Sequence, residues 1–210
     1  MKKRLSTPLS SLLCFIALPA FAAPLAPFNQ WAQQDFVGKN TISFSREGAD
    51  HQVDIFSNKT ASALYLEKEI NIVNTPILHW SWKISNVLNI SDETTKKTDD
   101  FPARIYVLAA TGPFPWQTQT LAYTWSNHQR TKTHWPNPYT DKVVMIAIDS
   151  GAQKQGTWQQ HSRNIQQDFE KYFGKKHKTI KAIALMSDTD NTGLQTSASY
   201  RQIYFSSSRP

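Results

Sequence analysis

The sequence predicts an all-β protein, an antiparallel β-sandwich or jelly roll of about nine strands with one short amphipathic helix near residues 163–173. Three observations lead to this expectation. Residues 76–84 alternate strictly between apolar and polar side chains, several further segments have the length and composition of strands, and a single stretch follows the helical period instead. The 210 residues are 12% aromatic and include only seven glycines, which favours a packed core over a glycine-repeat architecture.

The segment 76–84 is the clearest strand. Successive side chains of a strand point to opposite faces, so alternation with a period of two indicates one buried face. His79, Ser81 and Lys83 fall on the polar face. The opposite face, expected in the core, carries Leu78, Trp80, Trp82 and Ile84.

The remaining strands are assigned from similar patterns separated by polar turns. Segment 142–149 is apolar on both faces, which is typical of a central strand. Segment 127–141 is expected to be an irregular loop, and 90–101 is the longest polar loop. The other expected strands are 41–46, 52–57, 61–67, 103–109, 119–125, 179–187 and 199–205.

One stretch departs from the two-residue period. Ile165, Phe169 and Phe173 stand four residues apart, and Gly174 follows the last of them. This spacing places them on one face of a helix, and a glycine at the end is a common helix stop. The apolar face of the helix is expected to cover an end or edge of the sandwich.

The N-terminus has the pattern of an export signal. Lys2, Lys3 and Arg4 precede a short apolar stretch, and the small residues around Phe21 suggest cleavage after Ala22. The expected organisation is a signal peptide over 1–22 and a single domain over 23–210, located in the periplasm or outside the cell. The apolar stretch is too short to span a membrane comfortably, and no transmembrane segment is expected after it.

Charge and cysteine content exclude several classes of function. Removing residues 1–22 changes the net charge from +7 to +4 over 188 residues, which is not the footprint of a nucleic-acid-binding protein. It also removes Cys14, the only cysteine. The domain therefore has no disulfide, no thiolate nucleophile and no zinc–thiolate site.

Two acidic loops are the main candidates for binding. Asp99 and Asp100 precede the strand that begins with Ala103 and Arg104, and Asp188, Asp190 and Asn191 follow the strand 179–187. Either loop can also be purely structural, because Asp and Asn stabilise turns. The second loop resembles the start of an EF-hand, but its twelfth position is Ser199 rather than glutamate, so an EF-hand is rejected.

These loops meet if the strands 103–109 and 179–187 run antiparallel, because the start of one then lies beside the end of the other. We therefore expect one polar site built from both loops. So many carboxylates repel one another unless Arg104 or a cation compensates them. Calcium at Asp188 and Asp190 is the cofactor that the sequence suggests, and an internal hydrogen-bond network is the alternative. The site comprises Asp99, Asp100, Arg104, Asp188, Asp190 and Asn191.

A separate candidate ligand-binding pair is Trp158 with Arg163. An arginine beside an aromatic ring can recognise a carboxylate or a sugar face. The alternative is that Trp158 packs in the core and Arg163 forms a local ion pair with Asp168. Trp116 and Trp135 lie in expected loops and are the best candidates for exposed stacking on a sugar.

Several runs together resemble one bacterial family of secreted proteins, domain-of-unknown-function family 3047. The resemblance extends from about the strand at 61–67 to the C-terminus. It implies an exported bacterial protein and brings no known activity or catalytic residue. The runs are Leu78 to Lys83, Asp99 to Val107, Tyr123 to Trp125, Asn137-Pro138, Ser150-Gly151, Trp158 to Gly174, and Ala184 to Phe205.

Two classes of function remain. The first is a non-catalytic envelope module that binds a small ligand, with a glycan as the suggested class, since no HExxH or GxSxG motif occurs. The second is a carbohydrate-active hydrolase or lyase that uses loop carboxylates as general acid and base. The sequence assigns no catalytic residue and no oligomeric state, and fold alone does not separate the two classes.

Overall fold

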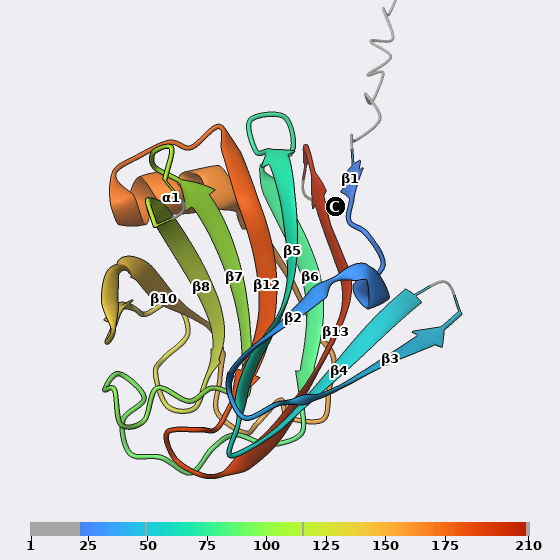
Figure 1. Ribbon diagram of the computed structural model, residues 1–210, viewed down its shortest axis with the longest axis vertical. Coiled ribbons are helices and arrows are strands. Elements are labelled where there is room, and N and C mark those ends of the chain that lie inside the picture. The colour runs from blue at the N-terminus through green and yellow to red at the C-terminus, as the bar shows by residue number, and fades with distance from the viewer. Residues whose placement is uncertain (1–21, 49, 115, 209–210) are drawn as a thin grey trace, which may run out of the picture.

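The computed structural model describes residues 22–48, 50–114 and 116–208. In these residues the chain forms two β-sheets with one α-helix at one end (Figure 1). Side chains from both sheets form the main core, so the predicted β-sandwich is confirmed. The predicted signal peptide lies outside the described residues except for Ala22, which begins the first strand.

The first sheet has six strands in the order β11-β6-β13-β4-β3, with β1 paired to β13. Every pairing in it is antiparallel. Its strands are β1 (Ala22–Pro24), β3 (Thr41–Glu47), β4 (Asp50–Asn58), β6 (Ile77–Ile84), β11 (Gln159–Asn164) and β13 (Gln195–Ser206).

The second sheet has seven strands in the order β2-β5-β12-β7-β8-β10-β9. The pairing in this sheet is antiparallel, as expected, except that β10 runs parallel to β8. A short 3-10 helix, η1 (Phe28–Gln30), precedes the sheet. Its strands are β2 (Ala32–Val37), β5 (Ala61–Asn71), β7 (Ala103–Ala110), β8 (Thr118–Ser126), β9 (His134–Asn137), β10 (Thr140–Ser150) and β12 (Thr179–Asp188).

All nine expected strands are present, and β1, β2, β9 and β11 are additional. The four additional strands are short; β11 consists entirely of polar residues, and β2 is half polar, and neither has an alternating pattern. Strand β9 lies inside 127–141, which was expected to be irregular; it forms because residues 134–137 pair with β10. Hydrogen bonding to a neighbouring strand, rather than local composition, produces these four strands.

The core between the sheets is built on β6. Leu78, Trp80, Trp82 and Ile84 are each at most 1% exposed, as their alternation predicts. Trp80 stacks on Tyr123 of β8 with ring centroids 5.4 Å apart, so the two sheets are joined by aromatic contacts. The outer-facing residues of β6 are also shielded, with His79 and Ser81 at 5% and 1% exposure.

The single α-helix among the described residues, α1 (Ile165–Phe173), lies near its expected position at one end of the sandwich (Figure 1). It begins two residues later than predicted, because Arg163 and Asn164 still pair with β6. The Asn164 side chain caps it by accepting from the backbone N–H of Gln167, and Gly174 ends it at a left-handed φ of 67°. At nine residues it is too short to cross a membrane.

Phe169 fixes the helix to the sandwich. Its ring is fully buried and contacts Phe173, which is itself only half-buried rather than buried as expected.

Replacing Phe169 with aspartate places an unpaired charge in this contact, and we expect the domain to lose its folded state. Circular dichroism and thermal melting measure the effect, with Gln167→Asp as the control. Gln167 is exposed in the first helical turn, where a negative charge is tolerated; a folded Phe169→Asp protein would contradict this packing.

Candidate functional site

Two acidic loops meet at the end of the seven-stranded sheet opposite α1 (Figure 1). One loop precedes β7, the other follows β12, and these strands are antiparallel neighbours, as the sequence predicts. One oxygen atom from each of Asp100, Asp188 and Asp190 lies within 4.8 Å of the others. We call this set the acid–arginine cluster, which consists of Asp99, Asp100, Arg104, Asp188, Asp190 and Asn191.

Arg104 is the cation at the centre of the cluster. Its side chain is 2% exposed, forms an ion pair with Asp188, and approaches Asp99 with 3.6 Å between Nη1 and Oδ2. Burial alone would lower the pKa of Arg104, but the neighbouring carboxylates, Asp188 first, raise it above its usual value. The guanidinium also lies over the rings of Phe101 and Tyr106, at 5.0 and 5.5 Å from their centroids. Arg104 therefore remains charged and compensates the carboxylates around it.

Asp100 joins the two loops through hydrogen bonds. It is fully buried, and its Oδ1 accepts from the backbone and side-chain N–H groups of Asn191 at 3.3 and 3.2 Å. Its Oδ2 accepts from the backbone N–H and hydroxyl of Thr192 at 2.7 and 2.6 Å. A carboxylate has about four acceptor positions, and these four donors occupy them. Asp100 thus holds the second loop in place and offers no free lone pair to a ligand.

Asp99 and Asp190 are less fully engaged. Asp99 is 5% exposed, and its Oδ2 accepts from the side chain of Asn137 at 3.4 Å. Its Oδ1 is buried and has no hydrogen-bond partner among the described residues. Burial raises the pKa of Asp99, and burial together with the nearby Asp100 raises the pKa of Asp190. These two carboxyls are the members of the cluster that a ligand can engage.

The predicted calcium ligands Asp188 and Asp190 do lie in this cluster, but the carboxylate oxygens of Asp188 already have partners within the protein. Asp188 Oδ2 pairs with Arg104, and its Oδ1 accepts from the backbone N–H of Phe101 at 3.1 Å. A calcium ion at Asp188 would compete with the guanidinium for the same oxygen. Calcium at Asp188 and Asp190 stays a prediction, and Arg104 already supplies the compensating charge.

The cluster closes one end of a groove on the outer face of the seven-stranded sheet. The groove has a volume of about 610 Å³. Ile105, Val107 and Leu185 of β7 and β12 point into the core, so the residues that alternate with them face the groove. We call it the sheet groove. Its lining outside the cluster is largely apolar and consists of Phe36, Ala61, Ala63, Tyr106, Leu108, Thr120, Asn137, Tyr139, Val143, Ala184 and Met186.

The turn between β9 and β10 forms one wall of the sheet groove. The register of these strands shifts between Thr140 and Val144, which allows the turn to leave the plane of the sheet. The hydroxyl of Tyr139 lies 3.0 Å from the carbonyl oxygen of Lys96 and 3.1 Å from Oδ1 of Asn191. This wall therefore contacts the cluster directly, although its tip is exposed.

The other predicted pair lies elsewhere. Trp158 is half-buried between two cations, with Lys83 Nζ at 4.9 Å and Arg201 Cζ at 4.1 Å from its ring. Nε of Arg163 donates to Asp168 at 2.8 Å, which is the local ion pair considered as the alternative. Trp158 and Arg163 are not part of the sheet groove.

The two tryptophans expected to be exposed differ from each other. Trp116 is 65% exposed and stacks in parallel on Phe114, with centroids 4.9 Å apart. Trp135 is only 9% exposed because it belongs to β9 and packs on Phe101. The expectation of exposed stacking is therefore wrong for Trp135.

Sequence reasoning did not identify Tyr106, Asn137 or Tyr139 as site residues. The sequence did contain an indication of the apolar base of the groove. Ala182, Ala184 and Met186 occupy alternate positions on β12, and residues at these positions would be polar if this face of the strand were fully exposed to water. No comparable signal marks Tyr139, whose position depends on the turn that precedes β10.

Known proteins give the following similarities. The xyloglucanase domain of NopAA, a type three effector from Sinorhizobium fredii, is 8% identical with a TM-score of 0.42, covering 90% of this chain and 98% of that domain. A family 12 xyloglucanase from Bacillus licheniformis is 8% identical with a TM-score of 0.43, covering 85% of this chain and 100% of the other. No curated protein sequence matches. The model of a family described as protein of unknown function, DUF3047, matches residues 29–204. The chain therefore belongs to the DUF3047 family.

Proposed function

We propose that this protein is an exported binding module whose sheet groove holds a small ligand, of the glycan class, without catalysing a reaction there. The observation that carries the proposal is a concave site with a largely apolar floor and a few convergent polar groups at one end. This combination is typical of small-molecule sites. A groove of about 610 Å³ has room for a few sugar rings.

The polar end explains how a sugar would be recognised. Asp99 Oδ1 is buried and unpartnered among the described residues, and a buried acceptor without a donor is unfavourable. Asp190 also lines the groove and is only half-buried, so a ligand hydroxyl can donate to its carboxylate. The C–H face of the same ring can lie against Tyr106, Leu108 and Met186, which line the floor. The amphipathic shape of a sugar ring fits both parts of the groove.

The charge of the site restricts the class of glycan further. The acid–arginine cluster holds four carboxyl groups and one guanidinium, so its net charge is negative. The net charge stays negative even when the carboxyl group of Asp99 is protonated. Neutral sugars and amino sugars are compatible with this potential, whereas uronic acids and sulfated sugars are repelled.

The cluster favours binding over catalysis because most of its carboxylates are already engaged. Glycoside hydrolysis needs two carboxyl groups that face the substrate, one of them acting as a general acid. Asp100 accepts four internal hydrogen bonds, and Asp188 is paired with Arg104. Only Asp99 and Asp190 remain available.

One observation supports the alternative, a hydrolase or lyase. Burial raises the pKa of Asp99, and a raised pKa is the property that a general acid requires. If Asp99 acts in this way, the purified protein releases new reducing ends from a bound glycan and Asp99→Asn abolishes the release. Binding without any such release supports the module instead.

A glycan array probed with residues 23–210, with calcium and with a chelator, tests the proposal. We expect neutral or amino sugars to bind. Titration calorimetry of the best glycan should show at least a ten-fold weaker Kd for Tyr106→Ala, which corresponds to about 1.4 kcal/mol. Tyr204→Ala is the matched control, because Tyr204 lies on the other sheet and should leave the Kd unchanged.

Three results would contradict this proposal: no array binding, preference for acidic sugars, or equal loss of affinity in Tyr106→Ala and Tyr204→Ala.

Titration calorimetry with calcium tests the metal prediction separately. A heat of calcium binding that disappears in Asp190→Ala would support it, whereas no heat would leave the acid–arginine cluster balanced by Arg104 alone. Export is tested by sequencing the N-terminus of the secreted protein, which we expect to begin at Ala23.

A further inference from the structure

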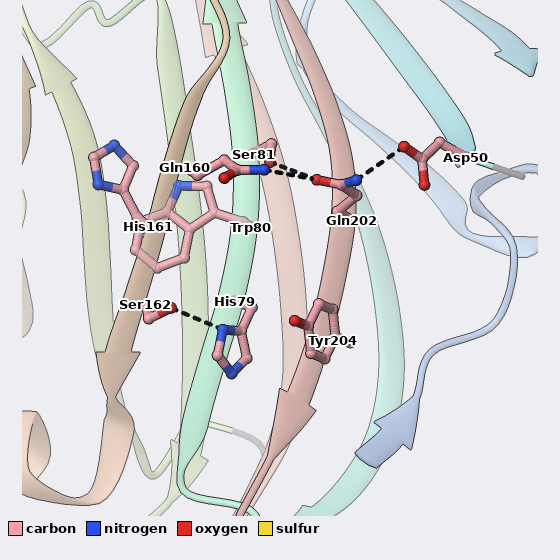
Figure 2. A pocket seen from close by; sticks show the side chains of 9 residues that line it. All are labelled: Asp50, His79, Trp80, Ser81, Gln160, His161, Ser162, Gln202 and Tyr204. Carbon is pink, nitrogen blue, oxygen red and sulfur yellow. Dashed lines mark hydrogen bonds between the residues drawn. The ribbon is translucent and has the colours of Figure 1, made fainter. Parts of the chain in front are cut away.

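A second pocket lies over the six-stranded sheet, away from the sheet groove (Figure 2). Its volume is about 600 Å³, and β6, β11 and β13 supply most of its lining. The lining is polar, in contrast to the apolar floor of the sheet groove. Figure 2 shows a serine and a histidine on adjacent strands joined by a hydrogen bond, and a separate chain of amide and carboxylate side chains.

The histidine is His79 of β6, and the serine is its cross-strand partner, Ser162 of β11. Ser162 Oγ lies 2.7 Å from Nδ1 of His79, and Ser206 Oγ lies 2.7 Å from Nε2. His79 is 5% exposed and stacks on Tyr204 with ring centroids 4.5 Å apart. The imidazole is thus held in one orientation by contacts to both nitrogens and to one face.

The hydrogen bonds determine which nitrogen carries the proton. Ser206 Oγ donates its hydrogen to the carbonyl oxygen of Ser208 at 2.5 Å, so it can only accept from Nε2–H of His79. Nδ1 of the neutral ring is then an acceptor, and Ser162 must donate to it. Burial lowers the pKa of His79, which favours this neutral form. The arrangement is a hydroxyl, a base that accepts its proton, and a third group that orients the base.

From this geometry we infer a second, catalytic site, in which Ser162 is a nucleophile and His79 its general base, acting on small uncharged acyl esters. Ser162 Oγ attacks the acyl carbon while its proton moves to Nδ1 of His79. The ester C–O bond then breaks, and the departing alcohol takes the proton from Nδ1, which leaves an acyl group on Ser162. Water reacts with this acyl group by the same route and releases the carboxylic acid, which restores the serine hydroxyl.

The pocket also holds a group that can stabilise the oxyanion. Gln160 lies two residues before Ser162 on β11, so both side chains are on the same face of the strand. One N–H of the Gln160 amide donates to Gln202 at 3.3 Å, and Gln202 in turn donates to Asp50 at 2.9 Å. This chain fixes the Gln160 amide and leaves its second N–H available to the pocket (Figure 2). Asp50 disfavours anionic substrates, which is why the ester is expected to be uncharged.

A fluorophosphonate probe and p-nitrophenyl acetate test the inference on residues 23–210. Intact-mass measurement should show one probe per chain, and peptide mapping should locate it on Ser162. Hydrolysis of p-nitrophenyl acetate should fall at least 100-fold in Ser162→Ala and in His79→Ala. Ser45→Ala is the control, because Ser45 is an exposed serine of β3 in the same sheet and does not line this pocket, so it should retain labelling and hydrolysis.

Ser162 is only half-buried, so Ser162→Ala is expected to fold even if His79→Ala does not, and circular dichroism checks both. The inference is overturned if the folded wild-type protein takes up no probe. It is equally overturned if the probe is found on another serine, or if Ser162→Ala hydrolyses the ester as fast as the wild type. None of these outcomes concerns the sheet groove, whose function is tested independently.

Discussion

Replacing Trp82 with alanine is expected to lower the free energy of unfolding by about 3–5 kcal/mol, the usual cost of truncating a buried tryptophan. The side chain is fully buried, and its ring lies 5.6 Å from that of Trp80 and 6.1 Å from that of Trp125. Its Nε1–H also donates to Oδ2 of Asp149 at 2.8 Å, a contact that joins the two sheets. The substitution therefore leaves a cavity and removes a donor from a buried carboxylate.

Chemical denaturation measures this loss as a shift of the midpoint at constant slope. Trp116→Ala is the matched control, since Trp116 is 65% exposed and its replacement should change the stability by no more than about 0.5 kcal/mol. An unchanged midpoint for Trp82→Ala would show that β6 does not face the core as described.

Asp188→Ala is expected to destabilise the protein by a similar amount, about 3–5 kcal/mol, because it leaves a buried guanidinium without its main partner. Arg104 is 2% exposed, and its remaining carboxylate contact, to Asp99, is 3.6 Å long. The substitution also removes the acceptor for the backbone N–H of Phe101. Loss of Asp188 should thus loosen both loops of the acid–arginine cluster.

Asp190→Ala is the control for this prediction. Asp190 belongs to the same loop but is only half-buried and forms no ion pair with Arg104. Its removal should change the free energy of unfolding by no more than about 0.5 kcal/mol, and relief of repulsion with Asp100 favours a small gain. Equal destabilisation by both alanine variants would contradict the assignment of Asp188 as the partner of Arg104.

The sandwich could be predicted from sequence where one face of a strand is apolar. The alternation of Leu78, Trp80 and Trp82 reflects a real buried face, and the spacing of Ile165, Phe169 and Phe173 located the helix to within two residues. Strands such as β2 and β11 could not be predicted, because their mostly exposed or half-buried residues form strands through pairing with neighbours rather than through burial.

For the candidate site, too, only some features could be predicted from the sequence. The meeting of the two acidic loops followed from the expected antiparallel pairing of β7 and β12. The roles of individual acids did not follow from it, since Asp100 and Asp188 differ only in which donors surround them. The sheet groove itself depends on the turn at Tyr139, whose position is set by a register shift that no local pattern encodes.

The most direct test of the proposed binding site is methyl NMR of residues 23–210 labelled at methionine. Two methionines remain in that range: Met186 lines the sheet groove, whereas Met145 is fully buried behind the groove wall, 3.7 Å from Nδ2 of Asn137, and does not line the groove. Addition of the best array glycan is expected to shift the Met186 methyl signal in step with binding and to move the Met145 signal much less. Measured binding with an unmoved Met186 signal would contradict the account, because the glycan would then be held somewhere other than the sheet groove.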